Sequence, residues 1–253
     1  MKTFRKMIMT GLIGAVIVSS AGCANDKPEM QSSDMVASET GSKMNVPEET
    51  TEAKASHQVS VEDLSKTTLS DDTTEYVSTC PKLIIDGVEA TEINSYVSEY
   101  IQNNYPMEKS EDEYGYVDGY ETRYAWGVKD NVVSIVIRAN YISEDYGTCE
   151  VFNFDLETRK ALEDGEVLKC FGMTDDELFE KTADIYRKYC SDGTTFDLDK
   201  SIASVNYDEI TPFVTPDGNL GVAGSIYYSA DSQFAGMATV RCFDVETMDL
   251  TNF

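Results

Sequence analysis

Adjacent acidic side chains occur throughout this sequence, for example at Asp112-Glu113, Glu144-Asp145 and Asp175-Asp176. Two carboxyl groups that flank a glycosidic bond can act as general acid and nucleophile in glycoside hydrolysis. The chain holds 46 Asp and Glu residues among 253, so neighbouring acids arise by chance. We therefore predict no catalytic residues, and we keep a hydrolase that uses an Asp/Glu pair as the alternative hypothesis.

Metal-binding and nucleophilic patterns are equally sparse. Asp192, Asp197 and Asp199 lie close in sequence but lack the Asp-x-Asp-x-Asp-Gly order of a calcium loop, which predicts a solvated turn. The single histidine, His57, lies in a polar N-terminal stretch, where a solvated linker residue is expected. If so, the folded region has no imidazole for a Ser-His-Asp triad or a histidine metal site. The sequence predicts neither a metal nor a cofactor.

The sequence around Cys23 predicts a covalent modification. Residues 1–22 have a secretion-signal layout: Lys2, Arg5 and Lys6 precede an apolar run, and a small-residue exit ends in Ala21-Gly22 before Cys23. This ending resembles a bacterial lipobox, which implies cleavage before Cys23 and acylation of its thiol. A lipid anchor, palmitate included, would hold the chain on the outer, extracytoplasmic face of the cell membrane.

Five further cysteines remain, and an odd number in an exported chain leaves at least one thiol unpaired. Cys170 and Cys190 flank a predicted helix about 24 Å long, so a bridge between them is not expected. No CxxC pair occurs, which speaks against a thioredoxin-like site. The other three cysteines are Cys80, Cys149 and Cys242, and the sequence leaves all pairings among the five open.

Composition predicts an acidic linker after the signal. Removing the signal takes away three basic residues and no acid, so the net charge of −26 becomes −29. Such a charge disfavours nucleic acid and anionic lipid headgroups and favours a cationic partner or simple solubility. Residues 23–74 are polar and contain no aromatic residue, so we predict a disordered linker there.

Residues 75–253 are predicted to form a single domain. Between Tyr120 and Leu162 three strand-like runs alternate between apolar and polar residues, and short connections between them favour antiparallel pairing. Helical spacing of apolar residues marks Glu89–Asn103, and a capping box of Thr174 with Glu177 begins a second helix that runs to Cys190. Further strands are expected at Lys82–Ile85, Ile210–Val214, Leu220–Tyr228 and Ala238–Asp244.

These elements predict an α+β fold: a largely antiparallel, meander-type sheet of about six strands with the two main helices packed on one face. The last strand ends in FDVET (243–247), which echoes FDLET (154–158). Five residues are too few to indicate duplication. We expect two strands that leave the sheet through similar turns.

Residues 153–162, NFDLETRKAL, resemble the N-[FY]-D-L-x-T-G-K-x-L segment of a bacterial extracytoplasmic domain of unknown function. That domain occurs in lysozyme-sensing anti-sigma factors and beside catalytic domains of peptidoglycan deacetylases. Residues 219–236 resemble its closing segment, and residues 81–101 resemble the opening of the module that precedes it. The resemblance implies an envelope-associated role, although this chain shows no spanning helix by which it could signal alone.

The chain departs from the family in two places. Glu144, Asp145 and Tyr146 stand where the family carries a Gly-Gly-Ala-His-Gly element, and Arg159 replaces a turn glycine. We expect ligand recognition at Glu144, Asp145 and Tyr146, together with Tyr114 and Tyr116, because exposed aromatic rings suit sugar stacking. The predicted function is a lipid-anchored, non-catalytic binding or sensing module of the cell envelope. Its expected partner is a wall-derived, peptidoglycan ligand or a cationic protein.

Overall fold

A three-strand antiparallel meander is the centre of the domain in the computed structural model, which describes residues 57–71, 73–111, 115–143, 147–191, 195–205 and 209–251. The strands are β5 (Val117–Lys129), β6 (Val132–Tyr141) and β7 (Gly147–Asp155), and β4 (Met107–Lys109) lengthens the sheet beside β5. The predicted alternation is confirmed, because Tyr124, Trp126 and Val128 all pack against one core cluster.

Strand β6 is buried on both of its faces. Val133, Ile135 and Ile137 lie in the core cluster that contains α2 (Thr91–Asn104). On the opposite face, Val136 packs into a separate cluster that contains residues of a second sheet. A strand covered on both sides carries apolar residues at nearly every position, as the run VVSIVI does. The meander is therefore an inner layer of the domain.

A long hairpin lies next to the meander and was not predicted. It consists of β1 (Val59–Ser70) and β2 (Glu75–Ile85), with the short β3 (Val88–Glu89) on the other side of β2. The prediction of a disordered linker up to Thr74 is wrong for residues 59–70. Most of β1 is exposed, so its composition is that of a solvated segment, and pairing with β2 is what orders it.

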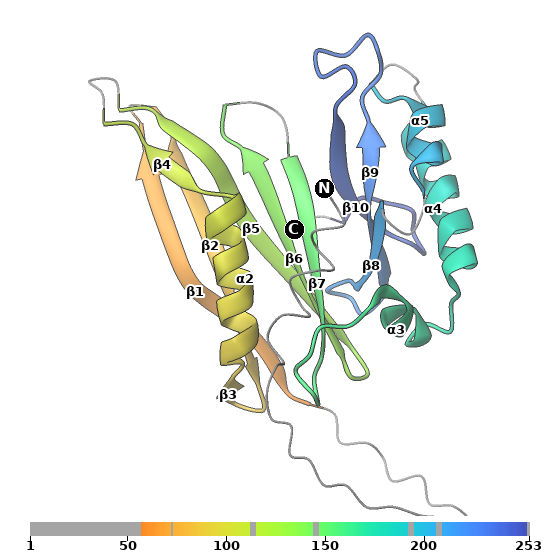
Figure 1. The fold of residues 1–253 in the computed structure, drawn as a ribbon, viewed down its shortest axis with the longest axis horizontal. Coiled ribbons are helices and arrows are strands. Elements are labelled where there is room, and N and C mark those ends of the chain that lie inside the picture. The colour runs from red at the N-terminus through yellow and green to blue at the C-terminus, as the bar shows by residue number, and fades with distance from the viewer. Residues whose placement is uncertain are drawn as a thin grey trace, which may run out of the picture. The chain divides into compact units, whose positions relative to one another are not determined.

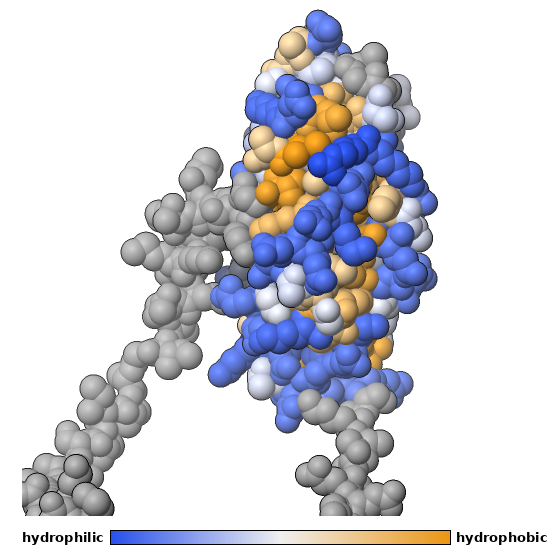
Figure 2. Space-filling model, turned by 90° about the vertical axis from the view of Figure 1, so that its right-hand side faces the viewer, coloured by the Kyte–Doolittle hydropathy of each residue, from blue (hydrophilic) through white to orange (hydrophobic). Residues whose placement is uncertain are grey.

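The second sheet has the strand order β10-β9-β8, from β8 (Ile210–Val214), β9 (Leu220–Tyr227) and β10 (Ala238–Asp244). Its outer face packs against α4 (Asp175–Tyr189) through Leu178, Ile185 and Tyr186. Two short helices, α3 (Asp164–Lys169) and α5 (Leu198–Ala203), complete this side. Figure 2 shows the side that α4 and α5 cover: hydrophilic residues dominate it, and hydrophobic surface gathers towards one end.

The coarse fold prediction is confirmed and the finer one is wrong. The domain mixes helices with antiparallel sheets, as expected, but the described residues form three sheets with ten strands in place of one six-strand meander. The two main helices do not share a face either. Helix α2 packs in the cluster of β2, β6 and β7, whereas α4 packs in the cluster of β9 and β10 (Figure 1). None of the helices in the described ranges is long and apolar enough to cross a bilayer.

The two FD-x-ET segments form the same turn. In the first, the backbone N–H of Asp155 donates to Lys160 O (2.9 Å), and Phe154 bridges to Ala161. In the second, the N–H of Asp244 donates to Asp249 O (3.0 Å). The second turn also repeats the bridge, between Phe243 and Leu250.

The same residue in each turn adopts a left-handed conformation. Arg159 has φ of 59° and Met248 has φ of 58°, and each N–H is bonded to the carbonyl of the preceding Asp. The Asp side chain accepts backbone N–H bonds in both turns, from Thr158 (2.6 Å) and from Thr247 (2.8 Å). Arg159 and Met248 thus adopt a backbone conformation that glycine adopts more readily than other residues. Each turn follows the last strand of a three-strand meander, so the similarity between the two segments extends beyond their five residues.

Candidate functional site

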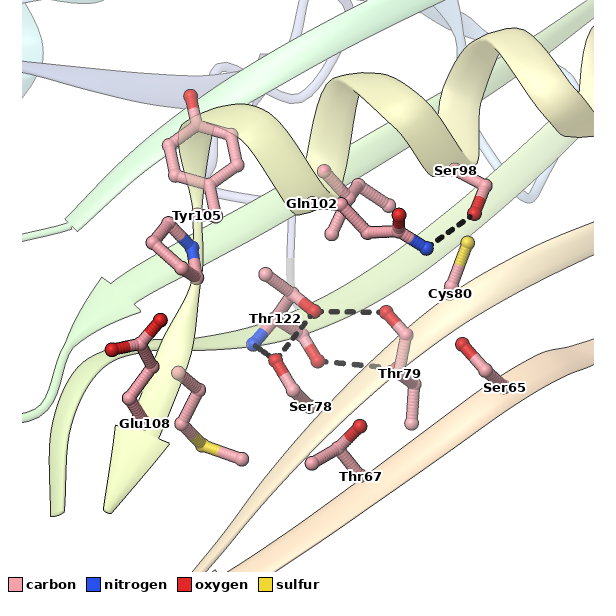
Figure 3. Close-up of a pocket in the computed structure, with 13 residues that line it drawn as sticks. Ser65, Thr67, Ser78, Thr79, Cys80, Ser98, Gln102, Tyr105, Glu108 and Thr122 are labelled. Carbon is pink, nitrogen blue, oxygen red and sulfur yellow. Dashed lines mark hydrogen bonds between the residues drawn. The ribbon is translucent and has the colours of Figure 1, made fainter. Parts of the chain in front are cut away.

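A polar pocket of about 250 Å³ lies where the β1–β2 hairpin meets β5 and the C-terminal end of α2 (Figure 3). Hydroxyl side chains dominate its lining and come from three strands and one helix. The lining residues are Ser65, Thr67, Ser78, Thr79, Cys80, Ser98, Ile101, Gln102, Tyr105, Pro106, Met107, Glu108 and Thr122.

The pocket exists because side chains, not a backbone ladder, join β2 to β5. The Ser78 hydroxyl accepts from the backbone N–H of Thr122 (3.0 Å), and the Thr122 hydroxyl donates to Thr79 O (2.8 Å). In return the Thr79 hydroxyl donates to Thr122 O (3.1 Å). Bridges through side chains keep two strands farther apart than the roughly 4.8 Å of a hydrogen-bonded pair. The β1–β2 hairpin is therefore set apart from the meander, and the pocket lies at this junction of β2 and β5.

The hydroxyl groups fall into two classes. Those of Ser78, Thr79 and Thr122 are bonded to one another or to backbone, as Figure 3 shows, and Thr122 is fully buried. The side chains of Ser65 and Thr67 are exposed on β1 and form no hydrogen bond to another described residue. The first class makes a rigid floor, and the second offers donors and acceptors to a ligand.

Tyr105 forms an aromatic wall of the pocket. Its ring lies edge-on to Tyr120 (5.3 Å between centroids) and to Tyr100 (6.2 Å). Its hydroxyl donates to Glu150 Oε1 (2.9 Å), and the side chain is only 9% exposed. Ring packing and the hydrogen bond of the hydroxyl together fix the orientation of Tyr105. A ligand that contacts this ring would therefore pay a smaller entropic cost on binding.

The pocket is close to neutral. Among the described residues, Glu108 is the only acid that lines it, and no basic residue does. Burial raises the pKa of the Cys80 thiol, against a smaller lowering by the Ser98 hydroxyl, so Cys80 stays protonated at neutral pH. Such a lining matches a ligand that presents hydroxyl and amide groups, not a phosphate or a metal ion.

His57 belongs to the folded unit, which corrects its assignment to a solvated linker. Its Nδ1 lies 2.7 Å from Asp86 Oδ2, and the hydrogen bond to His57 lowers the pKa of Asp86, assisted by the N–H of Gln58. The pair joins the chain before β1 to the turn after β2. The folded region therefore contains a histidine, so its composition no longer excludes imidazole chemistry there.

Several carboxyl groups are held in the charged form. Hydrogen bonds from the backbone of Thr73 and Thr74 lower the pKa of Asp71, and those from Thr174 lower the pKa of Glu177. Burial acts to raise the pKa of Asp155, but hydrogen bonds from Thr158 and other groups of its turn outweigh it. These groups stabilise turns and a helix start. Within the described ranges, no three His, Cys, Asp or Glu side chains are grouped so that they could hold a metal ion.

Most of the predicted site lies outside the described residues. This applies to Cys23, to Glu144, Asp145 and Tyr146, and to Tyr114. Tyr116 is described: it is 54% exposed and does not line the pocket.

The start of β5, the end of β6 and the start of β7 lie at one end of the meander. Tyr120, near the start of β5, pairs with Tyr141 at the end of β6, and Asn140 pairs with Gly147 at the start of β7. The β4–β5 and β6–β7 connections therefore leave the sheet at the same end (Figure 1).

The other aromatic residues of β5 are largely structural. Tyr124 and Trp126 pack against the core, and the Tyr124 hydroxyl donates to Asp63 Oδ1 (2.8 Å). Burial, followed by the bond to Asp63, raises the pKa of Tyr124 to about 12. Tyr120 joins a different aromatic row through Tyr105 and Tyr141.

Sequence reasoning missed the pocket because its residues are spread over the presumed linker, β2, α2 and β5. The alternation of Ser and Thr with other residues in 59–80 could have indicated strands, but the polar composition of its first part favoured a linker. No family model matches the chain, and no curated protein does.

Proposed function

We propose that this chain is a lipid-anchored, non-catalytic binding or sensing module of the bacterial envelope, and that the pocket of Figure 3 binds a wall-derived ligand. The observation that carries the proposal is the pocket itself. Paired Ser and Thr side chains form its floor, hydroxyls without a partner among the described residues lie at its edge, and a fixed tyrosine ring forms one wall. This combination suits a sugar ring, which has an apolar face and a periphery of hydroxyls.

The pocket's size and charge narrow the ligand class. Its volume of about 250 Å³ is slightly below the roughly 300–1,000 Å³ that is usual for small-molecule sites, which suits one amino sugar or a short peptide stem better than a long polymer. Glu108 supplies an acceptor for an amide N–H or an ammonium group. Peptidoglycan fragments contain both kinds of group. The described residues place a single acid in the pocket lining, so this site gives no support to the alternative of a hydrolase with an Asp/Glu pair.

Sequence features support the location. The signal layout and the lipobox-like Ala21-Gly22-Cys23 predict an acylated N-terminus outside the membrane. With β1 beginning at Val59, the predicted linker shortens to about 35 residues, a mean reach on the order of 30 Å if it is a flexible coil. The resemblance to a domain found near wall-modifying and lysozyme-sensing proteins points to the same compartment.

The test is calorimetric titration of the purified chain with soluble disaccharide-peptide fragments of peptidoglycan. In the variant Thr67→Trp an indole fills the pocket from the exposed strand β1, and we expect the affinity to fall at least tenfold. Thr68→Trp is the matched control, since neighbouring residues of a strand face opposite sides and Thr68 does not line the pocket.

Two results would count against the proposal. One is equal affinity in the two tryptophan variants, which would place binding elsewhere. The other is no binding of fragments together with salt-sensitive binding of lysozyme. That outcome would favour a cationic protein attracted by the net charge of −26.

A further inference from the structure

Two thiols from different sheets lie in contact. Cys149 is on β7 and Cys242 is on β10, and each strand is the edge of its own sheet. Their side chains pack in the same apolar cluster, with Val136, Phe213 and Ala223, and neither cysteine is in a disulfide. Figure 1 shows β7 and β10 as neighbours, and the Thr239 hydroxyl donates to Gly147 O (2.5 Å) between them.

The surroundings of the two thiols differ. Cys149 is half-buried, whereas Cys242 is only 3% exposed, so reagents reach Cys149 first. Arg138 is the cross-strand partner of Cys149, and Arg241 precedes Cys242 in the chain. The Arg241 Nε atom is buried and has no hydrogen-bond partner among the described residues.

These neighbours favour a thiolate on Cys149. The hydrogen bond from Cys242 lowers the pKa of Cys149, burial opposes this, and the charges of Arg138 and Arg241 lower it further. Burial raises the pKa of Cys242, and the bond to Cys149 adds to that rise. A partly exposed thiol of lowered pKa beside a fully buried thiol is the arrangement of an attacking and a resolving cysteine.

We propose that Cys149 and Cys242 are a redox-active pair that forms a disulfide between β7 and β10, with a small-molecule disulfide as the oxidant. The Cys149 thiolate attacks one sulfur of the oxidant, forms a mixed disulfide and releases one thiolate. Cys242 then gives its proton to a released thiolate, attacks the Cys149 sulfur and displaces the second thiolate. Two protein thiols are oxidised, and one small disulfide is reduced to two thiols.

The other described thiols have different surroundings. Cys80, Cys170 and Cys190 lie in or against three other hydrophobic clusters. Cys170 is the useful comparison, because it is also half-buried but burial raises its pKa. The proposal therefore predicts one bridge and three remaining thiols among these five cysteines.

The test is to incubate the full chain in mixtures of oxidised and reduced glutathione, block free thiols under denaturing conditions, and map tryptic peptides by mass spectrometry. Cleavage after Arg138, Arg159 and Arg241 places the two cysteines on peptides 139–159 and 242–253. We expect these peptides to be linked, with a combined mass lower by two hydrogens, and to separate on reduction. In the reduced chain, iodoacetamide should modify Cys149 at least tenfold faster than Cys170.

Variants sharpen the result. Cys242→Ser should leave Cys149 as a stable mixed disulfide with glutathione, and Cys170→Ser should leave the linked peptide unchanged. The mapping on the unaltered chain needs no variant, so a folding defect in one of them does not obscure it. A chain that never yields the linked peptide would overturn the proposal. Linkage of Cys149 to Cys80, Cys170 or Cys190 in equal amounts would also overturn it.

Discussion

The Ser134 hydroxyl joins the two sheets, and we predict that removing it destabilises the domain strongly. Ser134 lies on β6 and is fully buried. Its Oγ donates to Asn153 Oδ1 on β7 (2.6 Å) and accepts from the backbone N–H of Val214 on β8 (2.8 Å). The Asn153 amide in turn donates to Pro212 O (2.9 Å). The network therefore ties the inner faces of both sheets together.

The size of the effect follows from what Ser134→Ala leaves behind. The Val214 N–H and the Asn153 Oδ1 both lose their partner, in residues that are only 1% and 6% exposed. A buried polar group without a partner costs about 1–3 kcal/mol, so we expect the free energy of unfolding to fall by about 2–4 kcal/mol. For a domain of this size that corresponds to a Tm lower by roughly 5–15 °C.

Thermal unfolding followed by circular dichroism measures the change. Ser60→Ala, on the exposed strand β1, is the control and should shift stability by less than about 0.5 kcal/mol. In the double variant with Asn153→Ala, the two losses should not add, because both side chains belong to one network. The reasoning is refuted if Ser134→Ala behaves like Ser60→Ala, or if the two losses add fully.

Two further predictions concern a close approach and a turn. A side chain on Gly127 of β5 would overlap the carbonyl groups of Val214 and Thr215, so Gly127→Ala should lower the free energy of unfolding by about 1–3 kcal/mol in denaturant titrations. Gly165 of α3 has open space around it, so Gly165→Ala should be neutral or stabilising, and an equal loss in both would contradict the packing argument. The folded state holds the pKa of Asp155 below its usual value, so its contribution is present above about pH 4 and is lost as pH falls through the folded pKa. Asp155→Asn should flatten the acid side of the stability curve, and a curve of unchanged slope would show that the turn's hydrogen bonds contribute nothing.

Local patterns predicted the elements whose stability is local. The capping box of Thr174 and Glu177 begins α4, with the Thr174 hydroxyl accepting from the Glu177 N–H, as expected. The strand Ala238–Asp244 has the predicted bounds, because turn residues flank an apolar alternation. In such places neighbouring residues alone decide the conformation.

Contacts between elements that are distant in the sequence determine the features that local patterns did not predict. Ser134 is a polar residue within an apolar strand, and its burial depends on the second sheet that covers it. Strand β1 has few apolar residues, and its order comes from pairing with β2, from Val59 opposite Ile85 to Ser70 opposite Glu75. The pocket could not be predicted, because it requires β1 to be ordered and β2 to be joined to β5 through side chains.

The two halves of the domain share the repeated turn but differ in what covers their outer faces. The β5–β6–β7 and β8–β9–β10 meanders each follow a long helix and end in the same FD-x-ET turn, and their inner faces pack together. The second meander closes its outer face with α3, α4 and α5, whereas the first has α2 and the added β1–β2 hairpin. The hairpin meets β5 through Ser78, Thr79 and Thr122 instead of a backbone ladder, and the pocket lies at that seam. Replacing Ser78 and Thr79 should therefore alter ligand binding and hairpin docking together, while the meanders keep their register.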